Sequence, residues 1–339
     1  MPTKIARFVN TALFACAVFA QPPAEPLERV LHLTLIQNDR QLQEIATNIR
    51  GITEISQVSV DIAHKTLTLH GTAAQIAVAE WLLNQWDNAA PAQQPENRAA
   101  HEYRLSSDDI VRVFHLAHAP APRSLQEVAT IVRSTADIRR LFTYHAPSVV
   151  TVRGDATQIA LAAWLVNQLD QLPNQAARGT AFLEYRPSGD ADDVVRAFYP
   201  AHTGTPAGLQ ELATDVRLIG DIRRLFTSSE STALIARGTA AEMLLAEWLV
   251  NELDQPANQL PRAPAPHEYR PSGTVDDVVR VFFLTHAGSP QRLQQVTAEV
   301  RSATEVKRIF TYNAPRAITL RGAAAQIALA ERLISERDR

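Results

Sequence analysis

Pairs of charged residues recur in this sequence, and two kinds of pair have residue types that could form a site. Paired carboxylates can bind a divalent cation or exchange protons during catalysis. Paired basic residues can bind an acidic surface of another protein. The acidic pairs are Asp108 and Asp109, Asp192 and Asp193, and Asp276 and Asp277; the basic pairs are Arg139 and Arg140, Arg223 and Arg224, and Lys307 and Arg308.

Each kind of pair also has a simpler interpretation, which we favour. No further ligands and no histidine partner stand near the aspartates, so turn formation and solubility explain them better than metal binding. Exposed ion pairs contribute little, and only one residue of each basic pair can face a given surface. A third interpretation joins the two features: the aspartates meet the basic pairs of an adjacent module or subunit. The candidate interaction residues are therefore Arg139, Arg140, Arg223, Arg224, Lys307, Arg308, Asp109, Asp193 and Asp277.

Histidines recur as well, but their number argues against a metal centre. His118, His202 and His286 occupy equivalent places, whereas His115 forms an H-x-x-H pattern in one repeat only. Zinc requires three or four converging ligands, so we predict no metal site. The sequence also lacks G-x-S-x-G, H-E-x-x-H and phosphate-loop motifs. We therefore predict no catalytic residue, no cofactor and no enzymatic activity.

These pairs belong to an internal repeat, which must be recognised before any local motif is interpreted. A leucine, a glycine and an aspartate return in the same register at steps of 83 or 84 residues, which chance does not produce. The leucines are Leu42, Leu125, Leu209 and Leu293, the glycines are Gly71, Gly154, Gly238 and Gly322, and the aspartates are Asp87, Asp170, Asp254 and Asp338.

The second repeat shows the elements that must position these residues. Its β-branched and aromatic runs predict strands over 111–116, 137–144 and 149–153. Apolar residues at helical spacing predict one helix capped by Ser124 and another capped by Asp155. We therefore predict an α+β fold of four tandem βαββα modules, each a three-stranded sheet with two helices packed on one face.

The predicted modules span residues 26–88, 101–171, 183–255 and 267–339, and the Pro- and Ala-rich segments 89–100, 172–182 and 256–266 are linkers. Modules of this size bury too little surface alone, so neighbours or other subunits must contribute burial. A Glu-Tyr-Arg segment at the end of each linker is either a docking element, an added edge strand or a tyrosine anchor. Trp81, Trp164 and Trp248 correspond to Arg332, which suits a water-facing last unit.

Residues 1–20 read as a secretory signal. Lys4 and Arg7 precede an apolar run over 8–20, and we place the cleavage after Ala20. An uncleaved anchor, a mis-started reading frame and an outer-membrane lipoprotein at Cys16 are the weaker alternatives. The remaining sequence has no cysteine, no apolar run long enough to span a membrane, and 31 basic against 36 acidic residues. We predict a periplasmic or secreted protein that does not bind nucleic acid.

The modules resemble the N-terminal, ring-building domains of secretins, the outer-membrane channels of secretion systems and type IV pili. The resemblance rests on VSVDIAHKTLTLHG and the following TAAQIAVAEWLLNQWD in the first repeat, and on the same layout in the second and fourth. It implies periplasmic modules that stack into rings and contact partner proteins. The β-rich pore domain of secretins is missing, so channel activity is not expected. A weaker resemblance to the BON envelope domain also implies binding.

Together these features predict a non-enzymatic scaffold of the periplasm or cell envelope that binds proteins and can self-assemble, in association with protein secretion or pilus machinery. The alternative is a periplasmic protein that binds a ligand or peptidoglycan in grooves between modules.

Overall fold

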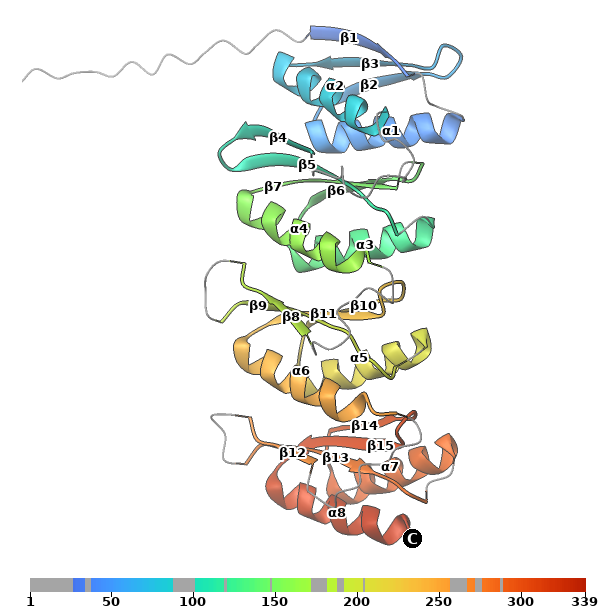
Figure 1. Cartoon of the computed structure of the whole chain (residues 1–339), viewed down its shortest axis with the longest axis vertical. Helices are drawn as coiled ribbons and strands as arrows, with labels where there is room; N and C mark the ends of the chain where they lie inside the picture. The colour runs from blue at the N-terminus through green and yellow to red at the C-terminus, as the bar shows by residue number, and fades with distance from the viewer. Residues whose placement is uncertain are drawn as a thin grey trace, which may run out of the picture.

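The computed structural model describes residues 27–33, 38–87, 101–118, 121–146, 148–171, 182–187, 192–203, 205–256, 267–271, 276–286 and 289–339. In this part of the chain, four sheets, each followed by two helices, are stacked in chain order (Figure 1). The predicted signal segment with Cys16, and nearly all of the predicted linker residues, lie outside the described residues.

The four modules repeat one order of elements. Module 1 contains β1 (Leu27–His32), α1 (Asp39–Thr53), β2 (Gln57–Asp61), β3 (Thr66–Gly71) and α2 (Ala73–Asp87). Module 2 contains β4 (His101–Ser106), β5 (Asp109–His115), α3 (Pro122–Thr135), β6 (Arg140–Tyr144), β7 (Val149–Gly154) and α4 (Ala156–Leu169). Module 3 contains β8 (Phe182–Tyr185), β9 (Val194–Phe198), α5 (Pro206–Gly220), β10 (Arg224–Ser228), β11 (Ala233–Gly238) and α6 (Ala240–Leu253). Module 4 contains β12 (His267–Tyr269), β13 (Val278–Phe283), α7 (Pro290–Thr304), β14 (Arg308–Tyr312), β15 (Ala317–Gly322) and α8 (Ala324–Arg337).

The predicted α+β fold of four βαββα modules is confirmed, with one addition to the sheets. Module 1 has three strands in the order β1-β3-β2. Modules 2 to 4 have four, in the orders β4-β5-β7-β6, β8-β9-β11-β10 and β12-β13-β15-β14, and all pairs are antiparallel. The extra strands β4, β8 and β12 contain the Glu-Tyr-Arg segments or their first residues, so the edge-strand interpretation of these segments is correct.

Helix capping matches the sequence prediction for the second helix but not for the first helix of module 2. Asp155 and Thr239 each form a capping box at the start of α4 and α6, and Ala323 provides no side-chain cap to α8. Ser124 is not the N-cap of α3, because Pro122 begins the helix and Ala121 precedes it. Proline favours the first helical turn, since its missing N–H would be unpaired there anyway.

Every internal helix layer lies between two sheets (Figure 1). Val111 and Val113 of β5 alternate in direction with Ile110 and Phe114, and the two sets join different hydrophobic cores. Ile110 and Phe114 pack on the helices of their own module, whereas Val111 and Val113 pack on α1 and α2 of the preceding one. The same division recurs at the next two sheets, where Val195 and Val279 pack on the preceding modules. Adjacent modules therefore share their cores, as in other repeat proteins.

One edge of each sheet is covered by an arginine from the first helix of the same module. Arg133 Nη2 donates to the carbonyl oxygen of Leu141 at 2.5 Å, and Arg301 Nη2 to that of Ile309 at 2.6 Å. Arg50 and Arg217 make the equivalent contact in modules 1 and 3, with Val58 and Leu225. A charged side chain on an exposed edge discourages pairing with strands of other molecules.

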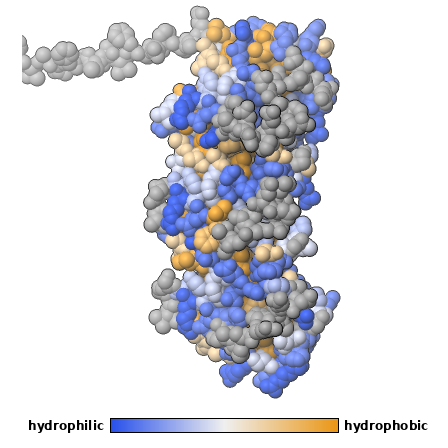
Figure 2. All heavy atoms as spheres, viewed as in Figure 1, coloured by the Kyte–Doolittle hydropathy of each residue, from blue (hydrophilic) through white to orange (hydrophobic). Residues whose placement is uncertain are grey.

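The outward faces at the two ends of the stack are more polar than the internal junctions. On the sheet of module 1, Glu28, Ser59 and Asp61 occupy the register positions that Val111, Phe142 and Tyr144 hold in module 2. On α8, Arg332 is exposed as predicted and Arg337 is exposed as well, and Figure 2 shows hydrophilic side chains around this end of the stack. Within the described residues, the helices are too short or too polar to cross a membrane.

Candidate functional site

The aspartates singled out in the sequence bind an arginine of their own module. Both carboxylate oxygens of Asp109 accept hydrogen bonds from Arg153, at 2.7 and 2.6 Å. Asp193 and Asp277 bind Arg237 and Arg321 in the same bidentate way. The hydrogen bond from Arg153 holds the pKa of Asp109 below its ordinary value, so this carboxylate stays charged in mild acid.

Each of these arginines also reaches the preceding module. Arg153 Nη1 donates to the carbonyl oxygen of Ile52 at 2.6 Å, near the end of α1. Arg237 and Arg321 donate in the same way to Thr135 and Ile219, at 2.5 and 2.8 Å. The last carbonyls of a helix lack partners within the helix, so these contacts satisfy groups that the junction buries. We call the contacts between modules 1 and 2, 2 and 3, and 3 and 4 junctions 1, 2 and 3.

The second residue of each basic pair meets a carboxylate across a junction. Arg224 Nη1 lies 2.7 Å from Asp137 Oδ2, and Arg308 Nη2 lies 2.8 Å from Asp221 Oδ2. Arg140 forms the equivalent pair with Glu54. These three acidic residues follow the first helix of each module in the left-handed backbone conformation. The pairs are largely exposed, so each contributes less than about 1 kcal/mol.

The first residue of each basic pair lies just before its strand and is exposed. These residues are Arg139, Arg223 and Lys307, and no ion pair of theirs is found with the described residues. The interpretation that the aspartate pairs meet the basic pairs is wrong in its pairing: the aspartates bind a third arginine, and Arg140, Arg224 and Arg308 bind acidic residues after the helices. That these groups bind a separate protein stays a prediction.

The missed residues are Arg153, Arg237 and Arg321, and the sequence contained a signal for them. Each stands one residue before the repeat glycine, and the first repeat has His70 there instead. Gln57 likewise replaces Arg140 in the first repeat. Module 1 has no preceding module among the described residues, so the arginines are absent where no junction needs them.

The remaining members of the acidic pairs have local roles. Asp192 Oδ1 accepts a hydrogen bond from the backbone N–H of Ala240, and Asp276 Oδ1 accepts one from Ala324, at 3.2 and 2.9 Å. Both donors lie in the first turn of a helix, where carboxylates are favoured. The backbone N–H of Asp108 donates to Ser106 Oγ at 3.3 Å in the β4–β5 hairpin.

The recurring histidines hold the ends of their own modules together. His118 Nδ1 lies 3.0 Å from the carbonyl oxygen of Asp170, and the Asp170 carboxylate accepts the backbone N–H of His118 at 2.6 Å. His202 with Asp254 and His286 with Asp338 repeat this arrangement. The described residues contain no cluster of three or more metal-ligating side chains.

Aromatic pairs connect each edge strand to the preceding module. Tyr103 of β4 packs on Trp81 of α2, with ring centroids 5.4 Å apart. Tyr185 with Trp164 and Tyr269 with Trp248 follow at 5.5 and 5.6 Å. Such tilted pairs add about 0.5–1.5 kcal/mol each beyond their buried area. Arg332 occupies the corresponding place in module 4.

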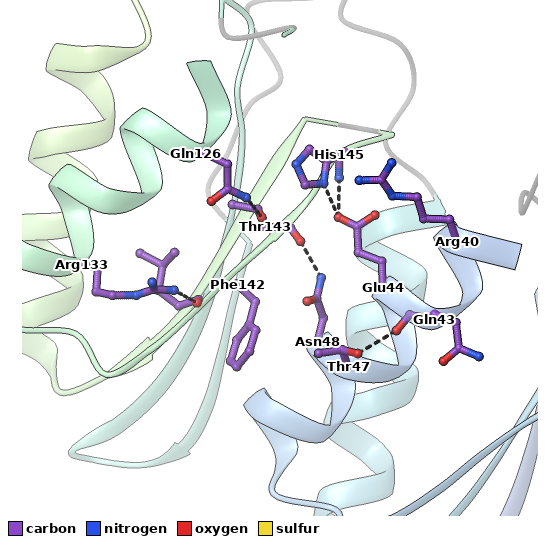
Figure 3. Close-up of a pocket in the computed structure, with 11 residues that line it drawn as sticks. Arg40, Gln43, Glu44, Thr47, Asn48, Gln126, Arg133, Phe142, Thr143 and His145 are labelled. Atoms are coloured by element: carbon purple, nitrogen blue, oxygen red, sulfur yellow. Dashed lines mark hydrogen bonds and ion pairs between the residues drawn. The ribbon is translucent and has the colours of Figure 1, made fainter. Parts of the chain in front are cut away.

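A groove of about 450 Å³ opens beside junction 1, between α1, α3 and β6 (Figure 3). Glu44 points at His145 and accepts its backbone N–H at 3.1 Å, while Asn48 Nδ2 donates to the carbonyl oxygen of Thr143 at 2.8 Å. Arg40 and Gln43 line the rim. The lining combines charged and polar groups with Leu141 and Phe142. The charged and polar groups can orient a polar ligand there.

Comparison with known proteins does not identify the chain. No family model matches the sequence, and no curated protein matches it. Solved structures with similarity include ExeD of Aeromonas hydrophila (13% identity, TM-score 0.16, 69% of this chain and 42% of that one) and the N-terminal domain of the secretin XcpQ from Pseudomonas aeruginosa (14%, 0.19, 42% and 62%). Dim2p from Pyrococcus horikoshii OT3 is also similar (15%, 0.23, 45% and 94%).

One of these neighbours is the N-terminal domain of a secretin. The chain spans less than half the length of ExeD.

Proposed function

We propose that this chain is an exported, non-enzymatic protein of the periplasm or cell envelope that binds other proteins as a scaffold, in association with protein secretion or pilus assembly. The sequence resemblance to ring-building secretin modules supports the location and the role. Self-assembly of the stack is part of the proposal.

The observation that carries the proposal is a line of exposed cations. Arg139, Arg223 and Lys307 stand at equivalent places before β6, β10 and β14, and the residues beside them are used inside the junctions. Because the modules stack in register, these charges lie along one side of the molecule. An acidic strip on a partner protein, or on a second copy, complements such a line and accelerates association.

Charge reversal tests this role without disturbing a junction. We expect the triple variant R139E/R223E/K307E to fold normally and to lose partner capture from envelope extracts, or to lose its oligomers in native mass spectrometry. Capture by the unmodified chain should weaken as salt is raised, because exposed charges are screened.

The matched control is R123E/R332E/R339E, which reverses three exposed arginines elsewhere on the molecule. If both triple variants capture partner proteins equally well, the line of exposed cations has no role in binding. A strictly monomeric chain that captures no envelope protein contradicts the scaffold proposal as a whole.

The groove beside junction 1 favours a second candidate, binding of a peptidoglycan fragment or another polar ligand. Soluble muropeptides should then bind the chain, and R40A should weaken binding without affecting stability, because Arg40 lies on the rim. Titration calorimetry measures this, and unchanged binding by R40A contradicts the candidate.

A further inference from the structure

The exposed edge of module 1 lacks a strand that the other modules have. In modules 2 to 4, the strand that precedes the first helix is covered by β4, β8 or β12. In module 1, β1 occupies this position and is the last strand of its sheet among the described residues. Its side chains are mostly exposed, including Leu27 and Val30 at 50% and 47%. An uncovered strand edge offers unpaired backbone groups to another strand.

In the other modules, an arginine on the neighbouring strand forms an ion pair with a glutamate of the covering edge strand. Arg196 of β9 lies between two glutamates, 2.8 Å from Glu184 of the edge strand and 2.8 Å from Glu247 of α6. Arg280 lies between Glu268 and Glu331 in the same way, at 3.8 and 2.8 Å. In each case the arginine and the edge-strand glutamate are direct cross-strand partners.

Module 2 keeps the edge-strand half of this arrangement. Arg112 stands directly opposite Glu102 of β4, with 3.9 Å between the charged atoms. The helix position that Glu247 and Glu331 hold is Ala163 here. The edge-strand glutamate is therefore common to all three covered sheets.

Module 1 contains the other half of the arrangement. Leu27 stands opposite Gly71 as Ile110 stands opposite Gly154, so Arg29 corresponds to Arg112. Arg29 Nε lies 2.6 Å from Glu80 Oε1 of α2, the partner that corresponds to Glu247. Its side chain is 58% exposed, against 8% for Arg196 and 14% for Arg280. In modules 3 and 4 the edge strand covers the arginine and supplies a second carboxylate. Among the described residues, Arg29 has only the helix carboxylate of Glu80.

The chain's own sequence does not offer that carboxylate at a matching distance. The edge-strand glutamate precedes its arginine by 10 residues in module 2 and by 12 in modules 3 and 4. The corresponding residues before Arg29 are Phe19 and Ala17, which are uncharged. The opposite edge of this sheet is occupied by Arg50, which binds the carbonyl oxygen of Val58. Among the described edges of module 1, β1 is therefore the one that can accept a strand.

We propose that β1 binds an extended segment of a partner protein, antiparallel to β1, with a glutamate or aspartate directly opposite Arg29. The inference rests on the proposed protein-binding role and specifies one of its surfaces. Backbone hydrogen bonds to β1 give the affinity, and the Arg29–carboxylate pair fixes the register. The segment completes a four-stranded sheet of the kind seen in modules 2 to 4.

A labelled peptide with the sequence of residues 100–107, which contains the edge strand β4, serves as the probe. Fluorescence anisotropy measures its binding to the full chain. We expect a peptide carrying E102K to bind at least about tenfold more weakly, since a like charge replaces the paired one. The chain variant R29E should reverse this preference and bind the E102K peptide better, which a misfolded variant cannot do. The control R332E should leave both affinities unchanged.

Equal binding of the two peptides, or no reversal with R29E, overturns the proposal. Binding that requires removal of residues 1–26 also overturns it, because the edge then belongs to the chain's own N-terminal segment. If the peptides fail while R139E/R223E/K307E still abolishes partner capture, only the β1 proposal is wrong and the scaffold role stands.

Discussion

Junctions 1 and 3 have the same arrangement of sheet and helix but differ in one buried side chain. In junction 1, Asn48 of α1 donates a hydrogen bond to the carbonyl oxygen of Thr143. The residue at this repeat position in α5 is Asp215, which is 2% exposed and whose Oδ2 has no hydrogen-bond partner. Ile131 holds the position in junction 2. One backbone plan therefore tolerates an amide, an alkyl group or a carboxyl at the same place.

The difference matters because burial penalises a charged carboxylate. Burial raises the pKa of Asp215 well above its ordinary value of 3.8, and the negative charge of Glu211 raises it further. Burial also raises the pKa of Glu211 itself and that of the nearby Tyr312 hydroxyl, the latter to about 12. Glu211 still accepts hydrogen bonds from Asn313 across the junction. The stability of junction 3 is therefore expected to depend on pH through Asp215, whereas junction 1 has a neutral amide that donates to Thr143.

The largest expected effect comes from the arginine that both junctions share. We expect R153A and R321A to destabilise junctions 1 and 3 by a similar amount, about 1.5–3 kcal/mol, because each leaves a partly exposed aspartate and a helix carbonyl without their arginine. Urea unfolding, monitored by amide hydrogen exchange in each module, measures the loss of stability at each junction. R139A, which removes an exposed arginine, should stay within about 0.5 kcal/mol. A clear difference between the two junctions contradicts their structural equivalence.

Exchanging the amide and the carboxyl tests the contrast itself. D215N should stabilise junction 3 by about 1–3 kcal/mol at neutral pH, because the amide can donate as Asn48 does. With Asp215 present, stability gained by protonation is complete below pH 3.8 and is lost as pH rises through the raised pKa. D215N should reduce this pH dependence and leave the part that Glu211 contributes, and N48D should introduce a pH dependence at junction 1. Unchanged pH profiles in both variants contradict the assignment.

The aromatic contacts should contribute equally at both junctions. We expect Y103A and Y269A each to cost about 1 kcal/mol beyond the lost buried area, because each removes a tilted pair with a tryptophan. Tryptophan fluorescence and urea unfolding report the change. If only one variant shifts the unfolding midpoint, the edge strands do not anchor the modules equivalently.

The smallest effect is expected at the exposed ion pairs. R140Q and R308Q introduce the residue that module 1 carries at the same place, Gln57, and should each cost less than about 1 kcal/mol. The loss should disappear at high salt, because both pairs are largely exposed. A loss as large as that of R153A would show that these pairs, rather than Arg153 and its equivalents, hold the junctions.

The repeat and the order of elements could be predicted from the sequence because hydrophobic spacing and glycine positions recur within each module. The sequence could not predict which face of each sheet packs on the preceding module, because strands such as β5 are apolar on both faces. The half-buried arginines Arg153, Arg237 and Arg321 escape sequence analysis for a related reason. Arg153 lies at the end of a strand, and nothing in one repeat distinguishes it from a solvated charge. Module 1 has His70 at the equivalent position. The reason for this replacement is clear only when the structure shows that the arginines lie at the junctions.

Sharing a core between neighbours has a mechanical consequence. A pull along the long axis of the stack loads the three junctions in series, so the weakest one opens first while the others hold. Opening it exposes valines on one side and helix carbonyls on the other, which favours reclosure when the tension falls. At neutral pH we expect junction 3 to be that point, and acidification to strengthen it against the same force.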